Sequence, residues 1–561
     1  MTLHRFNWID PHPIPSITNQ ELEIYPPVLR SILFQRGFTT LKDSQAFLSP
    51  EKPAWYPSQQ ILHTEKSCQI ITDAFHKKDR LAIFGDYDAD GITSTALLTH
   101  SLSKIGCQVI PYIPNRLEDG YGLNKKALSS LFDQGVKLLI TVDNGIRSEE
   151  EVTFANSLGM KVIVTDHHTP DKNLPPAAAI VNPKLPDDPY PFKDLAGVGI
   201  AYKLISALSV SFPEIIPSDY LDLVSIGTIA DIVPLVSENR YLVSQGLAVL
   251  NKLQRQSLVS LLGAANLLDQ KIRSSDISFQ IGPRINAPGR LDSAELSLDL
   301  LLSDDPHTCG NLAQILENQN FKRKKISSSM ESRAEQMIAG VSPFPPILFV
   351  VDTDFHLGVV GIAAGYLTRN FYAPSVVGKV DQETITASCR SIPEFNIVDA
   401  LDRCQDLLER YGGHSMAAGF TVTTHNFPEL KRRLINLANI SIAGRKLKPS
   451  LVIDAEVSLA QLDDSLYSDI EKLEPTGSGN PKVLFITKDL TTSQKKVVGQ
   501  DGEHLKLSVS DGKYCLDAIG FGLGCLSESI PHRVDLVYKF DINEFRGSRS
   551  FQLIIEDLKP A

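Results

Sequence analysis

The chain has 561 residues, of which 42% are hydrophobic, and a formal net charge of −11 from 66 acidic and 55 basic residues. A chain of this length is too long for one hydrophobic core and predicts about three or four domains. The acidic balance gives no global electrostatic signal for nucleic acid, but a total of this kind hides local basic grooves. Seven scattered cysteines, an odd number without CxxC spacing, argue against a disulfide framework and against a structural zinc site.

The sequence also argues against a membrane protein. The longest apolar runs, such as "ILFVV" (347–351), fall far short of the roughly 20 residues that a membrane span needs. The opening "MTLHRFNWIDPHPIP" has no apolar segment of the secretory kind. We therefore expect a cytoplasmic protein without a membrane partner.

The first 60 residues are rich in proline around one predicted helix, from Leu29 to Phe47. From residue 81 onward, short apolar runs predict strands at 81–84, 108–113, 137–142, 160–165 and 177–181. Helix-length segments at 93–105, 124–134 and 148–158 separate most of these strands. Alternating strands and helices predict an α/β fold with a parallel sheet that is covered on both faces.

The rest of the chain changes pattern twice. From about residue 200 to 337 it is mostly helical and ends in a polar, basic stretch that predicts a long exposed connecting helix. The segment "VSPFPPILFVVD" restarts the strand pattern and opens a second α/β unit, which extends to about residue 443. After a linker, residues 449–561 contain short alternating runs such as "HLKLSV" and "DLVYKF", which predict a small β-rich domain.

Three carboxylates follow the strand at 81–84, in "IFGDYDADGITSTAL". Asp86, Asp88 and Asp90 with Gly91 have the spacing that opens an EF-hand calcium loop. That loop needs a helix in front of it and a bidentate glutamate at its twelfth position, where this chain has a strand and Leu97. The aspartates therefore need an explanation other than an EF-hand.

Two further polar clusters follow predicted strands: Asp143 with Asn144, and Asp166 with His167 and His168. Ligands bind outside the carboxyl ends of the strands in an open parallel sheet, so the three stretches are expected to meet at one edge. Any single aspartate has an alternative interpretation as a helix cap or Asx turn. The whole set would repel or stay unpaired without a cation, which favours a pair of manganese, magnesium or zinc ions.

Asp231 lies within the otherwise apolar run "GTIADIVPL". An isolated aspartate in such a run is typical of a helix cap or of a hydrogen-bonded core acid. Together with the other clusters, it is a candidate ligand that completes the metal site.

Four of these stretches, in this order, resemble the motifs of the DHH phosphoesterase superfamily: "DYDADG" (86–91), "VDNG" (142–145), "DHH" (166–168) and "GTIADIVPL" (227–235). Other stretches resemble one branch of it, the RecJ family of bacterial single-strand-specific DNA exonucleases. They include "PNRLEDGYGL" (114–123), "LAGVGIAYKL" (195–204), "GPRINAPGRL" (282–291), "SCRS" (388–391), "GGHSMAAGF" (412–420) and "PTGSGNP" (475–481). The resemblance runs in family order across nearly the whole chain.

The resemblance implies a catalytic DHH domain, a long helix, a DHHA1 domain that closes a groove over the substrate, and an OB-fold. On this basis we place an N-terminal extension at 1–65, the DHH domain at 66–305, the connecting helix at 306–342, the DHHA1 domain at 343–445 and the OB-fold at 449–561. The implied activity is processive 5′→3′ release of mononucleotides from single-stranded DNA in recombination and repair. The implied partners are single-strand-binding protein and a RecQ-type helicase, and we expect a monomer.

The same resemblance assigns site residues. The family's metal ligands correspond to Asp86, Asp88, Asp90, Asp143, His167, His168 and Asp231, for two divalent cations, Mn²⁺ or Mg²⁺. Asp143 is the best candidate for a carboxylate shared between the ions. His168 either binds a metal or contacts the scissile phosphate, and we favour the second role.

The predicted substrate contacts lie outside the metal cluster. Arg116, Ser388 and Arg390 match family positions near a terminal phosphate, where an arginine fork suits phosphate oxygens. Gly412 and Gly413, before His414, would let the backbone approach a phosphate. The remaining groove candidates are Arg284 and Arg290. The run "KRKK" (322–325) is more typical of a solvated helix face, and the aromatic residues at 521, 538, 540 and 551 are more typical of a core than of base stacking.

Two alternative functions share parts of this pattern. A DHH phosphodiesterase for short oligonucleotides or cyclic dinucleotides would use the same metal site, but it would not need the N-terminal extension or residues 449–561. A non-catalytic scaffold, as in the eukaryotic replication-helicase relative of the family, would show substitutions among the metal ligands. Here the ligand set is complete.

Overall fold

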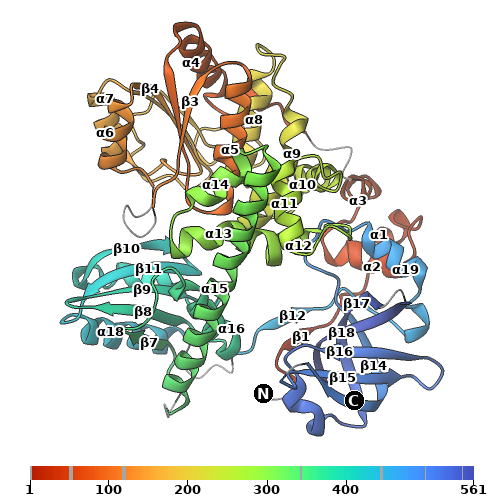
Figure 1. Ribbon diagram of the computed structural model, residues 1–561. Helices are drawn as coiled ribbons and strands as arrows, with labels where there is room; N and C mark the ends of the chain where they lie inside the picture. The colour runs from red at the N-terminus through yellow and green to blue at the C-terminus, as the bar shows by residue number, and fades with distance from the viewer. Residues whose placement is uncertain are drawn as a thin grey trace. The chain divides into compact units, whose positions relative to one another are not determined.

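The computed structural model describes residues 3–49, 55–115, 122–340, 344–442, 447–499, 501–545 and 548–561 (Figure 1). They form two compact units, one from the described parts of 1–55, 234–244 and 448–561, the other from those of 56–233 and 245–447. None of the described helices is both long and apolar enough to cross a membrane.

The larger unit begins with a five-stranded parallel sheet in the order β3-β2-β4-β5-β6. Its strands are β2 (Arg80–Phe84), β3 (Gln108–Tyr112), β4 (Val136–Val142), β5 (Lys161–Thr165) and β6 (Ala179–Val181). Helices α6 (Lys125–Asp133) and α7 (Glu149–Ser157) cover one face, and α4 (Thr64–Lys77), α5 (Ala89–Lys104) and α8 (Gly197–Leu208) cover the other (Figure 1). The predicted parallel sheet, covered on both faces, is confirmed.

Strand order reverses between β2 and β4. Strand β2 connects outward to β3, whereas β4 lies on its other side and leads toward β5. Ligands of such sheets bind in the crevice that this reversal opens at the carboxyl ends of the strands. The chain segments that leave β2 and β4 carry Asp86 and Asp143.

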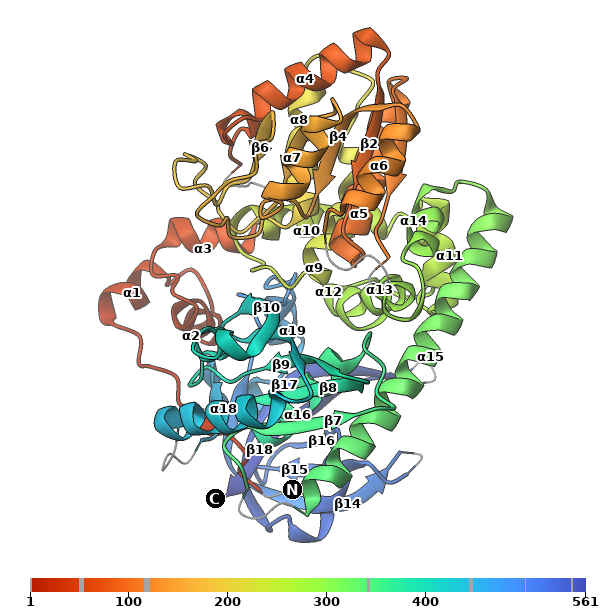
Figure 2. The ribbon, with the colours of Figure 1, turned by 90° about the vertical axis from the view of Figure 1, so that its left-hand side faces the viewer.

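A helical region follows the sheet, as predicted. Its elements are η2 (Pro217–Tyr220), α9 (Leu221–Ala230), α10 (Ser237–Leu250), α11 (Gln256–Ala264), α12 (Ser274–Asp276), the π-helix η3 (Ile277–Ile281), α13 (Gly282–Leu291) and α14 (Glu295–Leu302); the short helix η1 (Ser58–Gln60) precedes α4. The long helix α15 (Pro306–Ala339) then runs out of this region (Figure 2). Asp305 caps α15, since its carboxylate accepts from the backbone N–H of Thr308 at 2.8 Å. The run 322–325 lies on α15 with its lysines exposed, which confirms the prediction of a solvated face.

The second sheet of this unit has the order β10-β11-β9-β8-β7, in which β7 and β8 are parallel and the other pairs antiparallel. Its elements are β7 (Leu348–Asp352), α16 (Val360–Phe371), β8 (Ser375–Asp381), β9 (Thr384–Arg390), α17 (Ile397–Asp402), η4 (Gln405–Leu407), β10 (Leu408–His414), β11 (Ala417–Thr423) and α18 (Phe427–Ile442). Helices α15 and α16 pack on one face, and α17 and α18 on the other. The predicted second α/β domain is confirmed.

The smaller unit contains a sheet in the order β13-β14-β15-β16-β18-β17, which a further β14–β17 pairing closes into a barrel. Its elements are β12 (Ser450–Val452), β13 (Ala455–Glu456), η5 (Leu459–Gln461), α19 (Asp464–Glu471), β14 (Phe485–Val498), β15 (His504–Ser510), β16 (Cys515–Gly520), η6 (Gly524–Ser529), β17 (Arg533–Phe545) and β18 (Ser548–Pro560). A small closed barrel of this kind is the predicted OB-fold. Tyr538 and Phe540 are buried in its core and Phe551 packs against it, whereas Phe521 is 57% exposed.

The N-terminal residues belong to the same unit as the barrel. Strand β1 (Asn7–Ile9) pairs with β12, and helix α1 (Ser16–Glu21) follows it. The predicted single helix from Leu29 to Phe47 is wrong, because the structure has α2 (Pro27–Gln35) and α3 (Leu41–Leu48). Gly37 has a φ of +86° and Thr40 caps α3 through the N–H of Asp43, so a glycine stop and a threonine start divide the segment.

Candidate metal and phosphate site

The turn after β2 places Asp86, Asp88 and Asp90 around the start of α5. A Cβ on Gly91 would lie 2.5 Å from the backbone nitrogen of Asp86, so only glycine allows this tight turn. Asp88 caps α5, since its Oδ1 accepts from the N–H groups of Asp90 (2.9 Å) and Gly91 (3.2 Å). The helix-cap interpretation therefore holds for one oxygen of Asp88. Asp86, Asp88 and Asp143 nonetheless each offer an oxygen within 4.8 Å of the other two.

Asp90 joins this turn to the start of α8. Its carboxylate accepts from the N–H groups of Gly197 at 2.6 Å and Val198 at 2.8 Å, where the helix terminus favours negative charge. A Cβ on Gly197 would lie 2.7 Å from that of Asp143, and one on Gly227 would lie 2.9 Å from Oδ1 of Asp90. These glycines of "LAGVGI" and "GTIADIVPL" give the two carboxylates the space they occupy.

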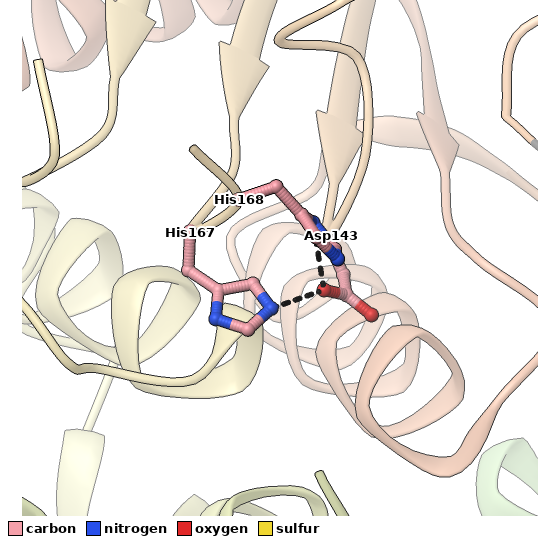
Figure 3. Close-up of side chains that lie close together, drawn as sticks. All are labelled: Asp143, His167 and His168. Atoms are coloured by element: carbon pink, nitrogen blue, oxygen red, sulfur yellow. Dashed lines mark ion pairs between the residues drawn. The ribbon is translucent and has the colours of Figure 1, made fainter. Parts of the chain in front are cut away.

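Asp143 and the two histidines meet at the ends of β4 and β5 (Figure 3). Oδ1 of Asp143 lies 3.1 Å from Nε2 of His167 and 4.0 Å from Nδ1 of His168. Nε2 of His167 also lies 3.5 Å from Oδ2 of Asp231. Asp143 has a left-handed backbone, with a φ of +62°, which turns its side chain toward this cluster. The sequence thus brings together residues up to 145 positions apart, Asp86 and Asp231.

Several donor atoms of this cluster are buried without hydrogen bonds. Oδ1 of Asp143, Oδ2 of Asp231 and Nε2 of His167 have no hydrogen-bond partner among the described residues. Buried polar atoms normally have partners, so three such atoms at one place fit a ligand set for a cation. The possible ligand groups are Asp143–His167–His168, Asp90–His167–Asp231 and Asp86–Asp88–Asp143, each within 4.8 Å.

Burial and mutual repulsion perturb the pKa values of these acids. Burial, and then the charges of Asp90 and Asp88, raise the pKa of Asp143 well above its usual range and that of Asp231 to about 9. Burial and the neighbouring Asp88 raise the pKa of Asp90 to about 7. Burial and then His168 lower the pKa of His167 to about 3, which keeps its imidazole neutral, as a metal ligand requires. The donor set therefore fits divalent cations such as Mn²⁺ or Mg²⁺.

Asp166 orients His168, a role that the sequence analysis did not assign. Oδ1 of Asp166 accepts from Nδ1 of His168 at 2.8 Å and from the N–H groups of His167 (2.7 Å) and His168 (3.0 Å). Its Oδ2 accepts from the N–H of Ile146 at 3.0 Å. Burial alone would lower the pKa of His168, but the bond to Asp166 and the acid cluster raise it overall. Because Nδ1 donates to Asp166, Nε2 is the nitrogen left for the site.

A second polar group lies on the second sheet of the larger unit, β10-β11-β9-β8-β7. In the strand register Ser388 lies beside Gly419, which lies beside Gly412, while Arg390, Ala417 and His414 form the next row. The antiparallel pairing of β10, β11 and β9 therefore brings the predicted "SCRS" and "GGH" residues together.

Ser388 and Arg390 also face the first turn of α16. A Cβ on Gly361 would lie 3.0 Å from Nη2 of Arg390 and 3.5 Å from Oγ of Ser388. A guanidinium, a hydroxyl and a helix N-terminus together are suited to a phosphate. Gly413 has a different reason to be glycine, since its Cβ would lie 2.3 Å from the carbonyl oxygen of Ala417 on the neighbouring strand. Gly412 has open space around it.

His414 links the two polar groups electrostatically. Its side chain is largely exposed. The part of it that is buried, and then the charges of Arg147, His168 and Lys184, lower its pKa. Arg147 and Lys184 were not predicted from the sequence, because each stands alone in a loop that follows a strand. They add positive charge beside the acid cluster, where a phosphodiester backbone would be attracted.

The remaining residues predicted to contact the substrate, Arg284, Arg290 and Arg116, differ in how free they are to bind it. Arg284 is 6% exposed, and its guanidinium donates to Glu317 on α15 and to the carbonyl of Gln280. Nη1 of Arg290 donates to the carbonyl of Gly358 at 3.3 Å. Between these arginines, Asn286 accepts from the N–H of Ala89 at 2.7 Å, so "INAPG" supports the first turn of α5. Arg116 lies outside the described residues.

Comparisons with known proteins agree with this arrangement. Three family models match: the DHH family N-terminal domain at residues 80–228, the DHHA1 domain at 345–439 and the RecJ OB domain at 453–557. The fold and the acid–histidine cluster thus define the class of DHH–DHHA1 phosphoesterases.

Full-length relatives narrow the class. The chain is 36% identical to the single-stranded-DNA-specific exonuclease RecJ of Escherichia coli, over 95% of this chain and 96% of that protein. It is 35% identical to RecJ of Bacillus subtilis, over 98% of this chain and 70% of that protein. The crystal structure of RecJ from Thermus thermophilus in complex with Mn²⁺ superposes with a TM-score of 0.86 at 28% identity, covering 99% of this chain and 80% of that one. The chain belongs to the RecJ family.

Proposed function

We propose that this protein is a metal-dependent exonuclease that degrades single-stranded DNA from the 5′ end and releases 5′-mononucleotides. The observation that carries the proposal is the cluster of carboxylates and imidazoles at the carboxyl edge of the parallel sheet. In it, Oδ1 of Asp143, Oδ2 of Asp231 and Nε2 of His167 are buried without a hydrogen bond from any described residue. The RecJ relatives, named as single-stranded-DNA-specific exonucleases, supply the substrate class. The barrel that matches the RecJ OB domain suits single-stranded DNA.

The metal ligands would be the four aspartates of the first two motifs together with His167 and Asp231: Asp86, Asp88, Asp90, Asp143, His167 and Asp231. When bound, two divalent cations make a water nucleophilic near neutral pH and offset the charge that develops on the phosphate. Asp143 belongs to two of the three ligand groups, as expected of a carboxylate shared between two ions. A neutral His167 and ionised carboxylates are the forms in which these residues bind a cation.

His168 would contact the scissile phosphate. Asp166 holds the proton of this ring on Nδ1 and favours the charged imidazolium, so Nε2–H is available to donate to a phosphate oxygen. A donor held in place before the reaction stabilises the growing charge without reorganisation. This arrangement supports the phosphate contact rather than metal ligation for His168.

The DNA strand would be gripped by the basic and polar residues that the sequence analysis named as substrate contacts, with Arg284 at the edge of the groove. These residues are Ser388, Arg390, Arg116, Arg290, His414, Gly412 and Gly413. Ser388 and Arg390, beside the start of α16, are suited to the terminal 5′ phosphate. A grip on the terminal phosphate would set both the polarity and the release of one nucleotide at a time. We further propose a monomeric cytoplasmic enzyme that acts in recombination and repair with single-strand-binding protein and a RecQ-type helicase.

A digest of end-labelled strands tests this function. Single strands of about 30 nucleotides, each carrying a label at one end, are incubated with the protein and Mn²⁺, with the 5′ or the 3′ terminus blocked. Mononucleotides from free 5′ ends, and none from blocked 5′ ends, are expected. Cleavage restricted to short oligonucleotides or cyclic dinucleotides would instead favour the phosphodiesterase alternative. A protein that binds Mn²⁺ but leaves every strand intact would favour the scaffold.

A further inference from the structure

Helix α13 lies between α5 and the second sheet of the larger unit (Figure 1 and Figure 2). Residues 286–290 of this helix, which we call the bridging segment, make contacts in both directions, and all of these contacts lie within the larger unit. Three observations connect the segment to the relative placement of the metal cluster and of Ser388 and Arg390, which we call the phosphate grip.

The first observation is the contact of the bridging segment with the turn that carries the first three aspartates. The first N–H groups of a helix have no partner within the helix. In α5 the carboxylate of Asp88 accepts from the second and third of them, and Oδ1 of Asn286 accepts from the first, that of Ala89, at 2.7 Å. Three residues further along α13, a Cβ on Gly289 would lie 2.9 Å from the carbonyl oxygen of Tyr87. The segment therefore contacts the backbone on both sides of Asp88.

The second observation is the contact of the same segment with the loop before α16. Nη1 of Arg290 donates to the carbonyl of Gly358 at 3.3 Å, and a Cβ on Gly358 would collide with the carbonyl oxygen of Arg290. Helix α16 begins two residues after Gly358. In its first turn, a Cβ on Gly361 would lie 3.0 Å from Nη2 of Arg390 and 3.5 Å from Oγ of Ser388. The close approach at Gly358 thus sets where α16, and with it the phosphate grip, lies relative to α13.

The third observation is that the bridging segment has little freedom to move. Its centre is buried, and the ring of Pro288 fixes one backbone angle within the helix. Directly before it, the carbonyl of Ile285 accepts from the hydroxyl of Ser297 on α14 at 2.8 Å, and Arg284 donates to Glu317 on α15. Because α13 is held by two further helices, a change at either end of the segment is expected to alter the spacing between its two contacts.

We propose that the bridging segment is a positioning element that fixes the distance between the metal cluster and the phosphate grip. The inference rests on the proposed function and deepens it. A strand whose terminal phosphate is bound by the grip reacts only if its first phosphodiester lies at the metal site, and a misplacement of about 1 Å costs about 10²-fold in rate. The segment therefore determines how much a 5′ phosphate accelerates cleavage.

Gly358→Ala tests the proposal, with Gly310→Ala as its matched control. The first adds a methyl group at the contact with Arg290, whereas a Cβ on Gly310, on α15, meets nothing within 4 Å. For each protein, kcat and KM are measured at saturating Mn²⁺ on strands with a 5′ phosphate and on the same strands with a 5′ hydroxyl, and Mn²⁺ binding is measured by calorimetry. For Gly358→Ala we expect kcat on phosphorylated strands to fall about 10²-fold. Its KM, its Mn²⁺ affinity and its kcat on hydroxyl strands should stay at the values of the wild type, and Gly310→Ala should match the wild type throughout.

Asn286→Ala changes the other end of the segment and keeps the test decisive if Gly358→Ala does not fold. It leaves the N–H of Ala89 without its acceptor and introduces no new contact. Because this turn carries candidate metal ligands, we expect Mn²⁺ affinity to fall about tenfold, in the range of lost outer contacts to metal ligands. The ratio of kcat on phosphorylated strands to kcat on hydroxyl strands should fall as well.

The proposal fails if a folded variant has a lower melting temperature but keeps this ratio of kcat values at that of the wild type. It also fails if the variants change KM alone, as residues that only contact the strand would. A wild-type protein that degrades both kinds of strand equally well would refute the phosphate grip and the inference with it. A wild-type protein that binds Mn²⁺ but leaves every strand intact would refute the proposed function itself, a result that differs from each of the others.

Discussion

The proposed metal cluster and the strands proposed to grip a phosphate, β9, β10 and β11 (the phosphate-gripping strands), belong to one unit but differ in burial and charge. Asp86, Asp90, Asp143 and His167 are all nearly inaccessible, and burial followed by the neighbouring carboxylates raises the pKa values of Asp90 and Asp143. Ser388 and Arg390 are partly exposed, and His414 is exposed. The first group is suited to a cation and the second to an anion. Changes in the first should therefore act on kcat, and changes in the second on KM.

The largest effect is expected for Asp143→Ala. It removes the carboxylate that two of the three ligand groups share, and the several kcal/mol that metal ions contribute correspond to a fall in kcat of about 10³-fold. Release of mononucleotides at saturating Mn²⁺ measures it. Asp304→Asn, an exposed carboxylate outside the cluster, is the control and should retain wild-type kcat. An Asp143→Ala protein of normal activity would refute the proposed metal site.

Asp166→Asn is expected to have the second-largest effect, a fall in kcat of about 10²-fold. An amide at this position no longer fixes the proton of His168 on Nδ1. The variant keeps the shape of the side chain, so Mn²⁺ binding should stay close to that of the wild type. Calorimetry beside the nuclease assay separates the two quantities. If the variant loses Mn²⁺ and not turnover, then Asp166 supports the metal ligands and not the histidine.

The cluster and the gripping strands also differ in how well the sequence predicted them. Aspartates and histidines at the ends of predicted strands were sufficient to predict that these side chains meet, because the edge of a parallel sheet brings such positions together. The assignment of metal ligands, with Asp231 at the end of α9, depended on the family resemblance. Asp166 stands in the same motif, but only the distance to Nδ1 of His168 distinguishes an orienting acid from a ligand. The division of the helix at Gly37 and Thr40 was missed because the apolar pattern continues across it.

The phosphate-gripping residues depended on the family resemblance. Strands β10 and β11 are joined by two residues and pair locally, but nothing in the sequence places β11 beside β9, so the neighbourhood of Ser388 and Gly412 is a result of tertiary pairing. Arg147 and Lys184 carried no signal, because lone basic residues in loops are usually solvated. Long-range packing also gave Arg284 a carboxylate partner, Glu317, that its motif did not suggest.

Arg390→Lys tests the gripping strands with a smaller expected effect. Lysine keeps the charge but loses the planar fork, so KM for 5′-phosphorylated strands should rise about tenfold while kcat stays constant. Strands with a 5′ hydroxyl should show no difference between the two proteins. Arg369→Lys, at an exposed position near the end of α16, is the matched control. A loss of kcat without a change in KM would place Arg390 with the metal cluster instead.

The smallest expected effect is a change of a few degrees in the melting temperature of the protein without bound metal. It comes from the titration of the acid cluster. The folded pKa of Asp231, about 9, exceeds its unfolded value of 3.8, so the folded state holds more protons between these values. The stability that Asp231 contributes is fully present below its unfolded pKa and is lost as the pH rises toward 9. The melting temperature of the chelated protein should therefore fall between pH 6 and pH 9, by about 1 °C for each kcal/mol lost in a chain of this length. Asp231→Asn, which cannot titrate, should show a shallower slope, and Mn²⁺ should flatten it in the wild type. An equally steep slope in Asp231→Asn would assign the pH dependence to other groups.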